Sequence, residues 1–537
     1  MQLMDARAAA SMIKDGDTVA LSGVVSLVVA DVVLRAIGER FLTEGSPRDL
    51  TIICPCRAGW QAGGEPTGIE HLAHPGLVSR ILSSSFSPAD SPHFMQLVAN
   101  GTIDAYIFPM GILFRWLREC TAGSPGLLTT VGLGSFLDPS TVNAGASRVT
   151  RTNENDRGID LVHRIKIDGI DCLFIRSLKI DVAIIKGSLA DTNGNVSMRD
   201  EPIDGGVLHM TMAARAAGGR VIAVVSELTL HGSLPAREVK VPSAFIDAVV
   251  VDPKAQPSVL GSVPSFTGQI RIPSPPLTKL TMGAQKIILR RALFELRNGD
   301  IVNLGFGMGS MLPGLARDEG VIDGLTFSLE HGAFGGIPAE GYPGNAGAFG
   351  AHFNPDAILD STEIFEFYHG GGLSATLLGF AQIDGAGRIN VGRYNGLIRG
   401  PGGYVDITHS TAKVLLVGTL TSGGLKLRID SGAKGARELR IVQEGKIRKM
   451  CAIVENVDFD SQLALRRGQL VRIITERAVF DSGPNGLVLV EVAPGIDIER
   501  DIVPQVDFVF QVSSALCVMS SEIFEETLMG LQLPSRH

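Results

Sequence analysis

Short apolar runs alternate along the whole chain with segments of helical periodicity. Residues 181–185 and 248–251 are nearly all aliphatic, whereas residues 282–294 place apolar side chains at three- and four-residue intervals. Apolar runs without a polar alternation are typical of strands that are covered on both faces by helices. The pattern therefore predicts an α/β protein with open, mainly parallel sheets, in which ligands bind beyond the carboxyl ends of the strands.

The order of turns and strands occurs twice. Residues 15–23 contain a Gly-Asp turn, an apolar strand and a small-residue loop, and residues 298–307 repeat this order. Residues 190–197 then resemble residues 381–391, and a Gly-Gly pair and a further apolar run follow each of them. Reuse of common turn residues by unrelated α/β units is the alternative explanation. Two matches in the same order favour a duplication, with two related domains.

A proline-rich segment separates the two halves. Its prolines are Pro253, Pro257, Pro264, Pro273, Pro275 and Pro276. Proline at this density disfavours the interiors of helices and sheets. We therefore expect a linker at residues 253–280, between an N-terminal domain at 1–252 and a C-terminal domain at 281–537, each long enough for its own core. The active site is expected at the interface of the two domains.

Composition excludes several classes of protein. The 537 residues carry a net charge of -8, so no basic surface for nucleic acid is expected. The N-terminus has no secretory signal pattern, and no apolar run is long enough to span a membrane, which predicts a cytoplasmic protein without a membrane partner. Six cysteines are too few for a disulfide scaffold. Cys54 and Cys56, with His71 and His74, lack the usual spacing of a zinc site, so no metal is expected.

Glu330 is the strongest candidate for a catalytic residue. It ends an apolar stretch, and a glycine-rich turn follows within residues 327–338. A carboxylate at the end of a strand, in a pocket of small residues, suits nucleophilic acyl chemistry. The glycines would let a substrate approach the backbone closely. The alternative is a solvated glutamate in a loop.

Two glycine clusters suggest sites for anionic groups. Gly305, Gly307 and Gly309 lie after a predicted strand and before a predicted helix, a context that suits a phosphate or an adenylated cofactor. Their spacing is not that of a dinucleotide-binding loop, and the chain has neither a phosphate-binding Lys loop nor a Gly-x-Ser-x-Gly nucleophile motif. In the second cluster, residues 370–372, successive glycines leave backbone N–H groups open to an oxyanion. A flexible turn is the other explanation.

These motifs, taken in order, carry a family resemblance. They comprise residues 131–139, 190–195, 330–338, 370–373, 475–480 and 493–497. Over nearly its full length the chain resembles the fused-subunit family I coenzyme A transferases. More narrowly, it is similar to the acetate, propionate or short-chain acyl-CoA:carboxylate transferases of the acetoacetate/3-oxoacid transferase superfamily. Each motif alone is weak, but their ordered set is specific.

The resemblance implies a mechanism and a set of site residues. Glu330 matches the glutamate that forms a glutamyl-CoA thioester in a ping-pong reaction, and Gly371, beside Gly372, matches the backbone donor to the oxyanion. The resemblance implies coenzyme A as a co-substrate with no permanently bound cofactor, acyl-CoA and small carboxylates as substrates, and a homodimer or homotetramer. The loop of Gly305, Gly307 and Gly309 is expected to line the pocket or to contact CoA.

The chain departs from the family pattern near the expected site. Met110 stands where the family usually has a glutamine that reaches the active site, and a methionine cannot donate a hydrogen bond. Residues 83–85 are serines where Gly-Gly-His is common, and Ser374 stands where Asp is frequent. We interpret these changes as altered acyl specificity. An acyl-CoA hydrolase on the same scaffold and a non-catalytic acyl-CoA-binding protein are the alternatives.

Overall fold

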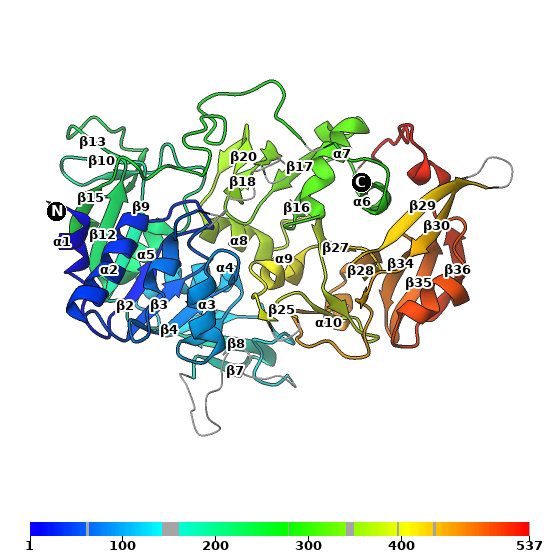
Figure 1. Ribbon diagram of the computed structural model, residues 1–537, viewed down its shortest axis with the longest axis horizontal. Helices are drawn as coiled ribbons and strands as arrows, with labels where there is room; N and C mark the ends of the chain where they lie inside the picture. The colour runs from blue at the N-terminus through cyan, green and yellow to red at the C-terminus, as the bar shows by residue number, and fades with distance from the viewer. Residues whose placement is uncertain are drawn as a thin grey trace.

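The computed structural model describes residues 1–60, 64–141, 160–277, 279–339, 348–394, 397–432 and 437–535. Figure 1 shows two lobes side by side, with the N-terminal half in blue to green and the C-terminal half in green to red. Each lobe is built on one large sheet. The predicted α/β class, with mainly parallel sheets, is confirmed.

The N-terminal lobe contains an eight-stranded sheet in which every pairing is parallel. Its strands, in spatial order, are β1 (Gln2–Met4), β15 (Ala248–Val251), β12 (Arg220–Val225), β9 (Val182–Lys186), β2 (Thr18–Leu21), β3 (Leu50–Cys54), β4 (Val78–Ser83) and β5 (Asp104–Ile107). The helices of this lobe are α1 (Ala6–Ala10), α2 (Asp31–Glu44), α3 (Pro92–Ala99), α4 (Met110–Thr121) and α5 (Val207–Ala216). All residues of β3 and β9 are buried, as a sheet covered on both faces requires.

The C-terminal lobe contains a ten-stranded mixed sheet. Its strands, in spatial order, are β21 (Ala357–Ile358), β18 (Ala333–Phe334), β17 (Leu325–Ser328), β16 (Asp300–Leu304), β22 (Ala375–Leu378), β27 (Lys413–Val417), β33 (Leu470–Ile474), β34 (Ala478–Gly483), β35 (Gly486–Val492) and β36 (Gln511–Val518). The helices are α6 (Ala284–Leu293), α7 (Leu312–Asp318), α8 (Ser361–His369), α9 (Tyr404–Ser410) and α10 (Ser461–Arg466). From β17 to β33 the pairings are parallel, and the antiparallel pairings lie toward the two edges.

The two sheets share one topology. The order β15-β12-β9-β2-β3 in the first sheet corresponds, strand for strand along the chain, to β33-β27-β22-β16-β17 in the second. The matching turn segments also form equivalent small strands, β10 (Leu189–Asp191) with β11 (Val196–Ser197), and β23 (Gln382–Ile383) with β24 (Arg388–Asn390). The predicted relation between the two halves is therefore confirmed in three dimensions.

A small antiparallel sheet packs on the lower side of the molecule. It consists of β6 (Gly126–Thr129), β8 (Ile170–Arg176) and β7 (Val162–Ile167). Figure 1 shows β7 and β8 below α4. Trp116 of α4 is buried and donates from its ring nitrogen to the Arg176 carbonyl at 3.0 Å, which joins this sheet to the helix.

The proline-rich segment at residues 253–280 has no regular secondary structure in its described part, and it packs on the C-terminal lobe. Phe266 is buried, with its ring centroid 4.8 Å from that of Phe353. The Asn354 N–H donates to the Ser265 carbonyl at 2.7 Å. The linker is therefore anchored by its own side chains and backbone.

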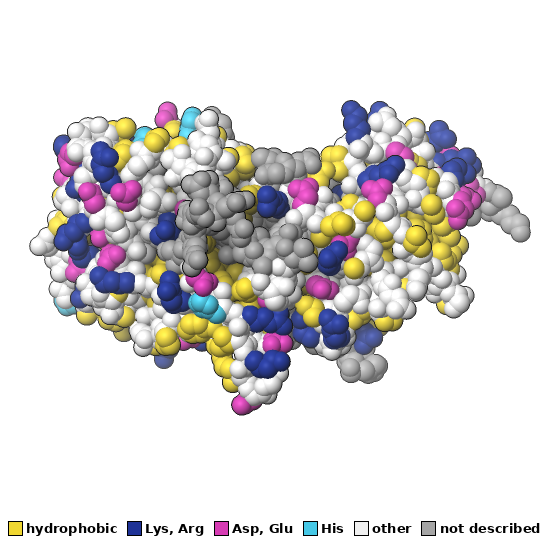
Figure 2. Space-filling view, turned by 90° about the horizontal axis from the view of Figure 1, so that it is seen from below, with side chains coloured by type: hydrophobic (Ala, Val, Ile, Leu, Met, Phe, Trp, Pro, Cys, Tyr) yellow, Lys and Arg dark blue, Asp and Glu magenta, His cyan; other side chains and the backbone are white. Residues whose placement is uncertain are grey.

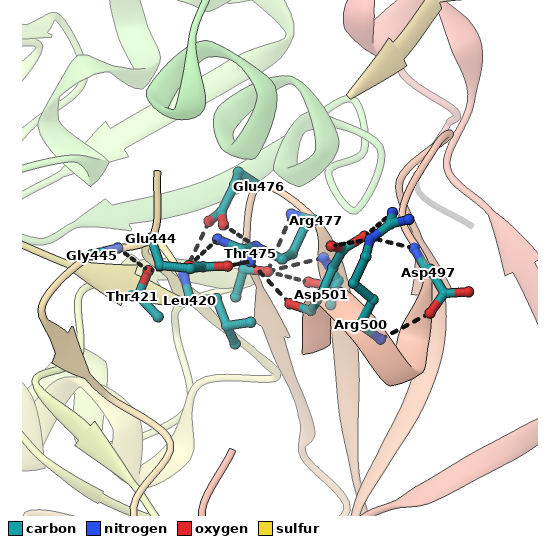
Figure 3. A network of polar contacts seen from close by, with 11 residues as sticks. Leu420, Thr421, Glu444, Gly445, Thr475, Glu476, Arg477, Asp497, Arg500 and Asp501 are labelled. Atoms are coloured by element: carbon teal, nitrogen blue, oxygen red, sulfur yellow. Dashed lines mark hydrogen bonds and ion pairs between the residues drawn. The ribbon is translucent and has the colours of Figure 1, made fainter. Parts of the chain in front are cut away.

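The turn between β33 and β34 holds a buried ion network, which Figure 3 shows. The Arg477 side chain is fully buried; it donates to Glu476 at 2.6 Å, to Glu444 at 2.6 Å and to the Asp501 carbonyl at 3.0 Å. The second Glu476 oxygen accepts from the Leu420 N–H at 3.0 Å. Residues 475–480, one of the motifs of the family resemblance, thus tie together several connections of the C-terminal lobe.

Candidate active site

Glu330 lies two residues beyond the end of β17, at the carboxyl edge of the second sheet. The residue is only 6% exposed. Burial raises the pKa of its carboxyl to about 7; hydrogen bonds from its own backbone N–H and from Asn303 oppose this shift, and the charge of Asp406 adds to it. A carboxylate of this pKa is half ionised near neutral pH and poorly solvated, as a nucleophile for acyl chemistry should be.

The Asn303 side chain contacts the Glu330 carboxylate. Its Nδ2 atom lies 3.5 Å from Glu330 Oε2 and 3.2 Å from the Ser328 carbonyl, and its Oδ1 accepts from Thr376 at 3.1 Å. These contacts fix the amide so that its nitrogen, not its oxygen, faces the Glu330 carboxylate and the Ser328 carbonyl. Ser328 also pairs with the Tyr368 hydroxyl at 2.8 Å, within the same buried network.

The N-terminal lobe faces Glu330 with the equivalent strand end. In the first sheet Ala20 is paired with Ile53, as Asn303 is paired with Ser328 in the second, so Pro55 occupies the position that corresponds to Glu330. The adjacent Cys56 is buried; burial raises the pKa of its thiol to about 11, and the charge of Glu330 contributes to this rise. Two related strand ends therefore meet, and only one of them carries a carboxylate.

The two lobes are joined beside this point by backbone hydrogen bonds. The Met110 N–H, at the start of α4, donates to the Gly402 carbonyl at 2.9 Å, and the Gly402 N–H donates to the Ser84 carbonyl at 3.0 Å. The Gly111 N–H donates to Asp406 Oδ2 at 2.9 Å. Met110 is 3% exposed, so an apolar side chain lies where the family commonly has an amide. Glu330, the predicted nucleophile, therefore lies close to contacts between the two lobes, and the position of the active site between them stays a prediction.

The glycine loop after β16 lies on the same sheet edge as Glu330. Gly305 donates its N–H to the Leu377 carbonyl at 2.8 Å, and a side chain at Gly309 would come within 2.6 Å of that carbonyl. Gly307, with a φ of +103°, has open space around it. Two glycines therefore let the loop pack on β22, and the middle one faces outward beside the site.

Gly371 and Gly372 lie elsewhere, contrary to the expectation that they face the nucleophile. They precede β22, whose parallel pairing with β16 puts them at the amino edge of the sheet, the edge opposite to Glu330. Their N–H groups donate to the Tyr368 and Phe367 carbonyls, at 3.0 and 2.9 Å, and so close the C-terminal turn of α8. Amides used in this way cannot also hold an oxyanion at Glu330.

Asn303 and Asp406 are the site residues that sequence reasoning did not single out. Asn303 is a fully buried polar residue within an apolar strand, which is itself a signal. Asp406 is also fully buried, and it follows the Gly-Gly pair at 402–403 that was noted only as part of the repeat. The sequence alone did not show that Asn303 and Asp406 lie close to Glu330 in the folded protein.

Neither a metal cluster nor a membrane span is found in the described ranges. No group of three His, Cys, Asp or Glu side chains there is arranged to hold a metal ion. His71 instead lies 3.2 Å from Asp31, and His74 stacks on Phe41. None of the helices described is both long and apolar enough to cross a bilayer.

Comparison with known proteins identifies the family. Residues 3–252 match the family model described as coenzyme A transferase. Acetate CoA-transferase YdiF of Escherichia coli strain K12 is 34% identical over 536 residues, which cover 99% of this chain and 97% of the relative. Caffeate CoA-transferase of Acetobacterium woodii is 35% identical over 541 residues, which cover 99% and 98%.

Solved structures agree with the sequence relatives. The apoenzyme of the acyl-CoA transferase YdiF from Escherichia coli O157:H7 superposes with a TM-score of 0.89 at 33% identity, covering 99% of this chain and 98% of that one. The same enzyme in a thioester complex with CoA superposes with a TM-score of 0.87 over the same shares. The chain therefore belongs to the coenzyme A transferase family and is a CoA-transferase.

Proposed function

We propose that Glu330 is the nucleophile that carries coenzyme A from an acyl-CoA to a carboxylic acid. The observation that supports this role is a single buried carboxylate, with a pKa of about 7, at the meeting point of two related strand ends. The equivalent position in the other lobe is Pro55, which offers no nucleophile. Burial makes the ionised carboxylate reactive, because few solvent hydrogen bonds must be broken before it attacks.

The reaction proceeds in two half-reactions. A Glu330 oxygen attacks the thioester carbonyl, and the carbon–sulfur bond breaks to give an acyl-glutamyl anhydride and the CoA thiolate. The thiolate attacks the glutamyl carbonyl, so the glutamyl-CoA thioester forms and the first carboxylate leaves. The acceptor carboxylate reverses these steps and leaves as a new acyl-CoA. The thioester is conserved at each stage, so no ATP is consumed, and ping-pong kinetics follow.

Asn303 is our candidate for the donor that stabilises the negative charge on the glutamyl carbonyl. Its Nδ2 atom already lies 3.5 Å from Glu330 Oε2, and the bond from Thr376 to its Oδ1 fixes the amide orientation. A preorganised donor of this kind contributes roughly 3 kcal/mol to transition-state stabilisation. This assignment replaces Gly371, whose N–H is already committed to the turn after α8.

Coenzyme A is proposed to bind along the outward side of the Gly305, Gly307 and Gly309 loop. The loop shares the sheet edge of Glu330, and Gly307 presents backbone with open space around it. YdiF, a relative with the same fold, has been crystallised as a thioester complex with CoA. A homodimer or homotetramer and a cytoplasmic location stay predictions from the family resemblance.

The acyl group is proposed to have an apolar body. The N-terminal lobe brings Cys56 near Glu330 and Met110 to the contact with Gly402; both are nearly fully buried, and neither offers a strong hydrogen-bond donor. Such an environment favours aliphatic or aromatic carbon over a second polar group. Acetate and caffeate, the acids in the names of the two relatives, are a small and a large acid with which to test this proposal.

Isotope exchange tests the proposed function. The protein is incubated with an acyl-CoA and the matching ¹³C-labelled acid, and transfer of label into the thioester is followed. Wild type should exchange label, Glu330→Gln should not, and the matched exposed variant Glu363→Gln should behave as wild type. Release of free CoA without an acceptor would favour a hydrolase, and binding without exchange would favour a non-catalytic protein.

A further inference from the structure

A cavity of about 720 Å³ lies away from the candidate active site, between the small β6-β8-β7 sheet and the C-terminal parts of α4, α8 and α9. These helices start near the catalytic site: α4 begins at Met110, α9 follows Gly403, and the residue before the α8 cap, Leu359, donates its N–H to the Gly332 carbonyl at 2.9 Å. The length of α8, about 13 Å at 1.5 Å per residue, separates the two places.

Arg115 brings a cation without a carboxylate partner to this cavity. Its Nη1 lies 3.1 Å from His369 Nδ1, and because arginine only donates, that histidine nitrogen accepts. Among the described residues, Arg115 forms no ion pair and its buried Nε has no acceptor. The carboxylate nearest to it on α8, Glu366, is already paired with Arg118. Burial lowers the pKa of Arg115 and the charge of Arg118 adds to this shift, while the carboxylates of Glu366, Asp406 and Glu119, none of which forms an ion pair with it, oppose the shift.

Among the described residues, the other ionisable groups near Arg115 do not neutralise its charge through an ion pair. His409 lines the same cavity; burial lowers its pKa to about 3, and the charges of Arg467, His369 and Arg115 add to this shift. Asp168 is at the rim, in the turn between β7 and β8. Asp406 lies behind His369, whose Nε2 donates to it at 3.0 Å. Two arginines, Arg115 and Arg118, line the described part of this cavity, and of the two only Arg118 is paired with a carboxylate.

The opposite wall of the cavity is apolar and exposed. Leu128, Ile167 and Ile170 line it, and they are 43%, 43% and 60% exposed. Figure 2 views the molecule from below, the side on which β7 and β8 lie, and shows hydrophobic side chains next to Lys and Arg side chains there. A cationic wall that faces an apolar one fits a ligand with a charged end and a hydrocarbon body, and the volume is within the range of small-molecule sites.

We propose that this cavity binds an organic monocarboxylate with an apolar chain, with its carboxylate on Arg115 and its chain against Leu128 and Ile170, separately from the catalytic site. A guanidinium matches a carboxylate in charge and geometry. None of the lining residues belongs to the set assigned to catalysis, so the binding site stands whether or not Glu330 is the nucleophile.

The cavity is also joined to the catalytic site. Asp406 accepts from His369 on the side of the cavity and from the Gly111 N–H on the side of Glu330. A carboxylate beside Arg115 competes with His369 for that guanidinium, and it therefore changes the environment of Asp406. Since the charge of Asp406 bears on Glu330, occupancy of the cavity should alter the rate of CoA transfer.

Direct binding tests this proposal independently of turnover. The probe is 6,6,6-trifluorohexanoate, titrated into Glu330→Gln protein and followed by ¹⁹F NMR. Two sites are expected. In this background Arg115→Met should weaken one of them by about tenfold or more, since a charge-assisted hydrogen bond is lost, and leave the other unchanged. The exposed variant Arg35→Met on α2 is the matched control.

A second variant guards against misfolding of Arg115→Met. Ile170→Glu puts a carboxylate on the exposed rim, where the fold tolerates it, and should weaken the same site by repulsion. Unchanged affinity in both variants, or a parent that binds no probe, would overturn the proposal, whereas even a single site supports it if both variants weaken that site. A parent that binds no probe at the cavity and sediments as an oligomer, which Ile170→Glu dissociates, would show an interface between copies instead and would also overturn it.

Discussion

Asn303 and Glu330 come from neighbouring parallel strands, and the Asn303 amide nitrogen lies 3.5 Å from the Glu330 carboxylate. The contact exists because β16 and β17 end at the same sheet edge, with Asn303 paired to Ser328. Every acyl transfer that we propose changes the charge on the glutamyl oxygens. A fixed amide beside them is therefore both a stabiliser of the ionised nucleophile and a donor to its tetrahedral intermediates.

Replacing Asn303 with leucine should slow catalysis without removing the nucleophile. We expect kcat to fall by about 100-fold, because one preorganised donor is lost. Steady-state kinetics with saturating acyl-CoA measure the effect. Thr376→Val, which only releases the Asn303 oxygen, should cost much less. Equal losses in the two variants would point to disturbed packing and against a role for the amide.

The activity should follow the ionisation of Glu330. Burial raises the pKa of this carboxyl to about 7, and only its ionised form attacks, so kcat/KM for the acyl-CoA should rise about tenfold per pH unit below pH 7 and level off above it. Asp406→Asn removes a negative charge that raises the pKa of Glu330, so the rise of kcat/KM with pH should occur at lower pH in this variant. A profile that stays flat from about pH 5.5 to 8 would contradict the assignment.

Met110→Gln should change the preference among acids. The buried methionine presents carbon and sulfur where an amide would present a donor, so the variant should lose activity with long or aromatic acids relative to acetate. The ratio of kcat/KM values across a series of acyl-CoA chain lengths measures this preference. An unchanged series would show that Met110 does not contact the acyl group.

Arg477→Met should destabilise the C-terminal lobe without a specific effect on chemistry. It leaves Glu476 buried without its ion-pair partner, which typically costs about 3–5 kcal/mol. The double variant Glu476→Gln/Arg477→Met keeps an acceptor for the Leu420 N–H and removes the unpaired charge, so it should recover part of the loss. Urea unfolding monitored by circular dichroism gives both values. A single variant as stable as wild type would exclude a structural role for the network in Figure 3.

Much of this architecture could be predicted from the chain. The apolar runs marked strands such as β9 and β15, and the repeated Gly-Asp turns marked β2 and β16 as equivalent. The order of the shared strands then proved to be the same in both sheets. Local patterns succeed here because strands buried on both faces and tight turns restrict the residues that they accept.

The residues around Glu330 were harder to predict from the sequence. The glycines at 370–372 have the composition expected of an oxyanion loop, yet their N–H groups close the end of α8 at the opposite edge of the sheet. Strand direction decided this, because a loop before a strand and a loop after its neighbour lie at opposite edges when the strands are parallel. Asn303 was marked only by being polar within an apolar strand, and Asp406 reaches the site through tertiary packing, which no local spacing encodes.

The most direct test of the central claim is the mass of the protein during turnover. The enzyme is incubated with a saturating acyl-CoA and no acceptor, quenched in acid, and analysed intact and after digestion. We predict one CoA adduct per chain, carried by the peptide that contains Glu330 and absent from Glu330→Gln. Label exchange at the wild-type rate with no adduct at Glu330, or with the adduct on another residue, would contradict the account.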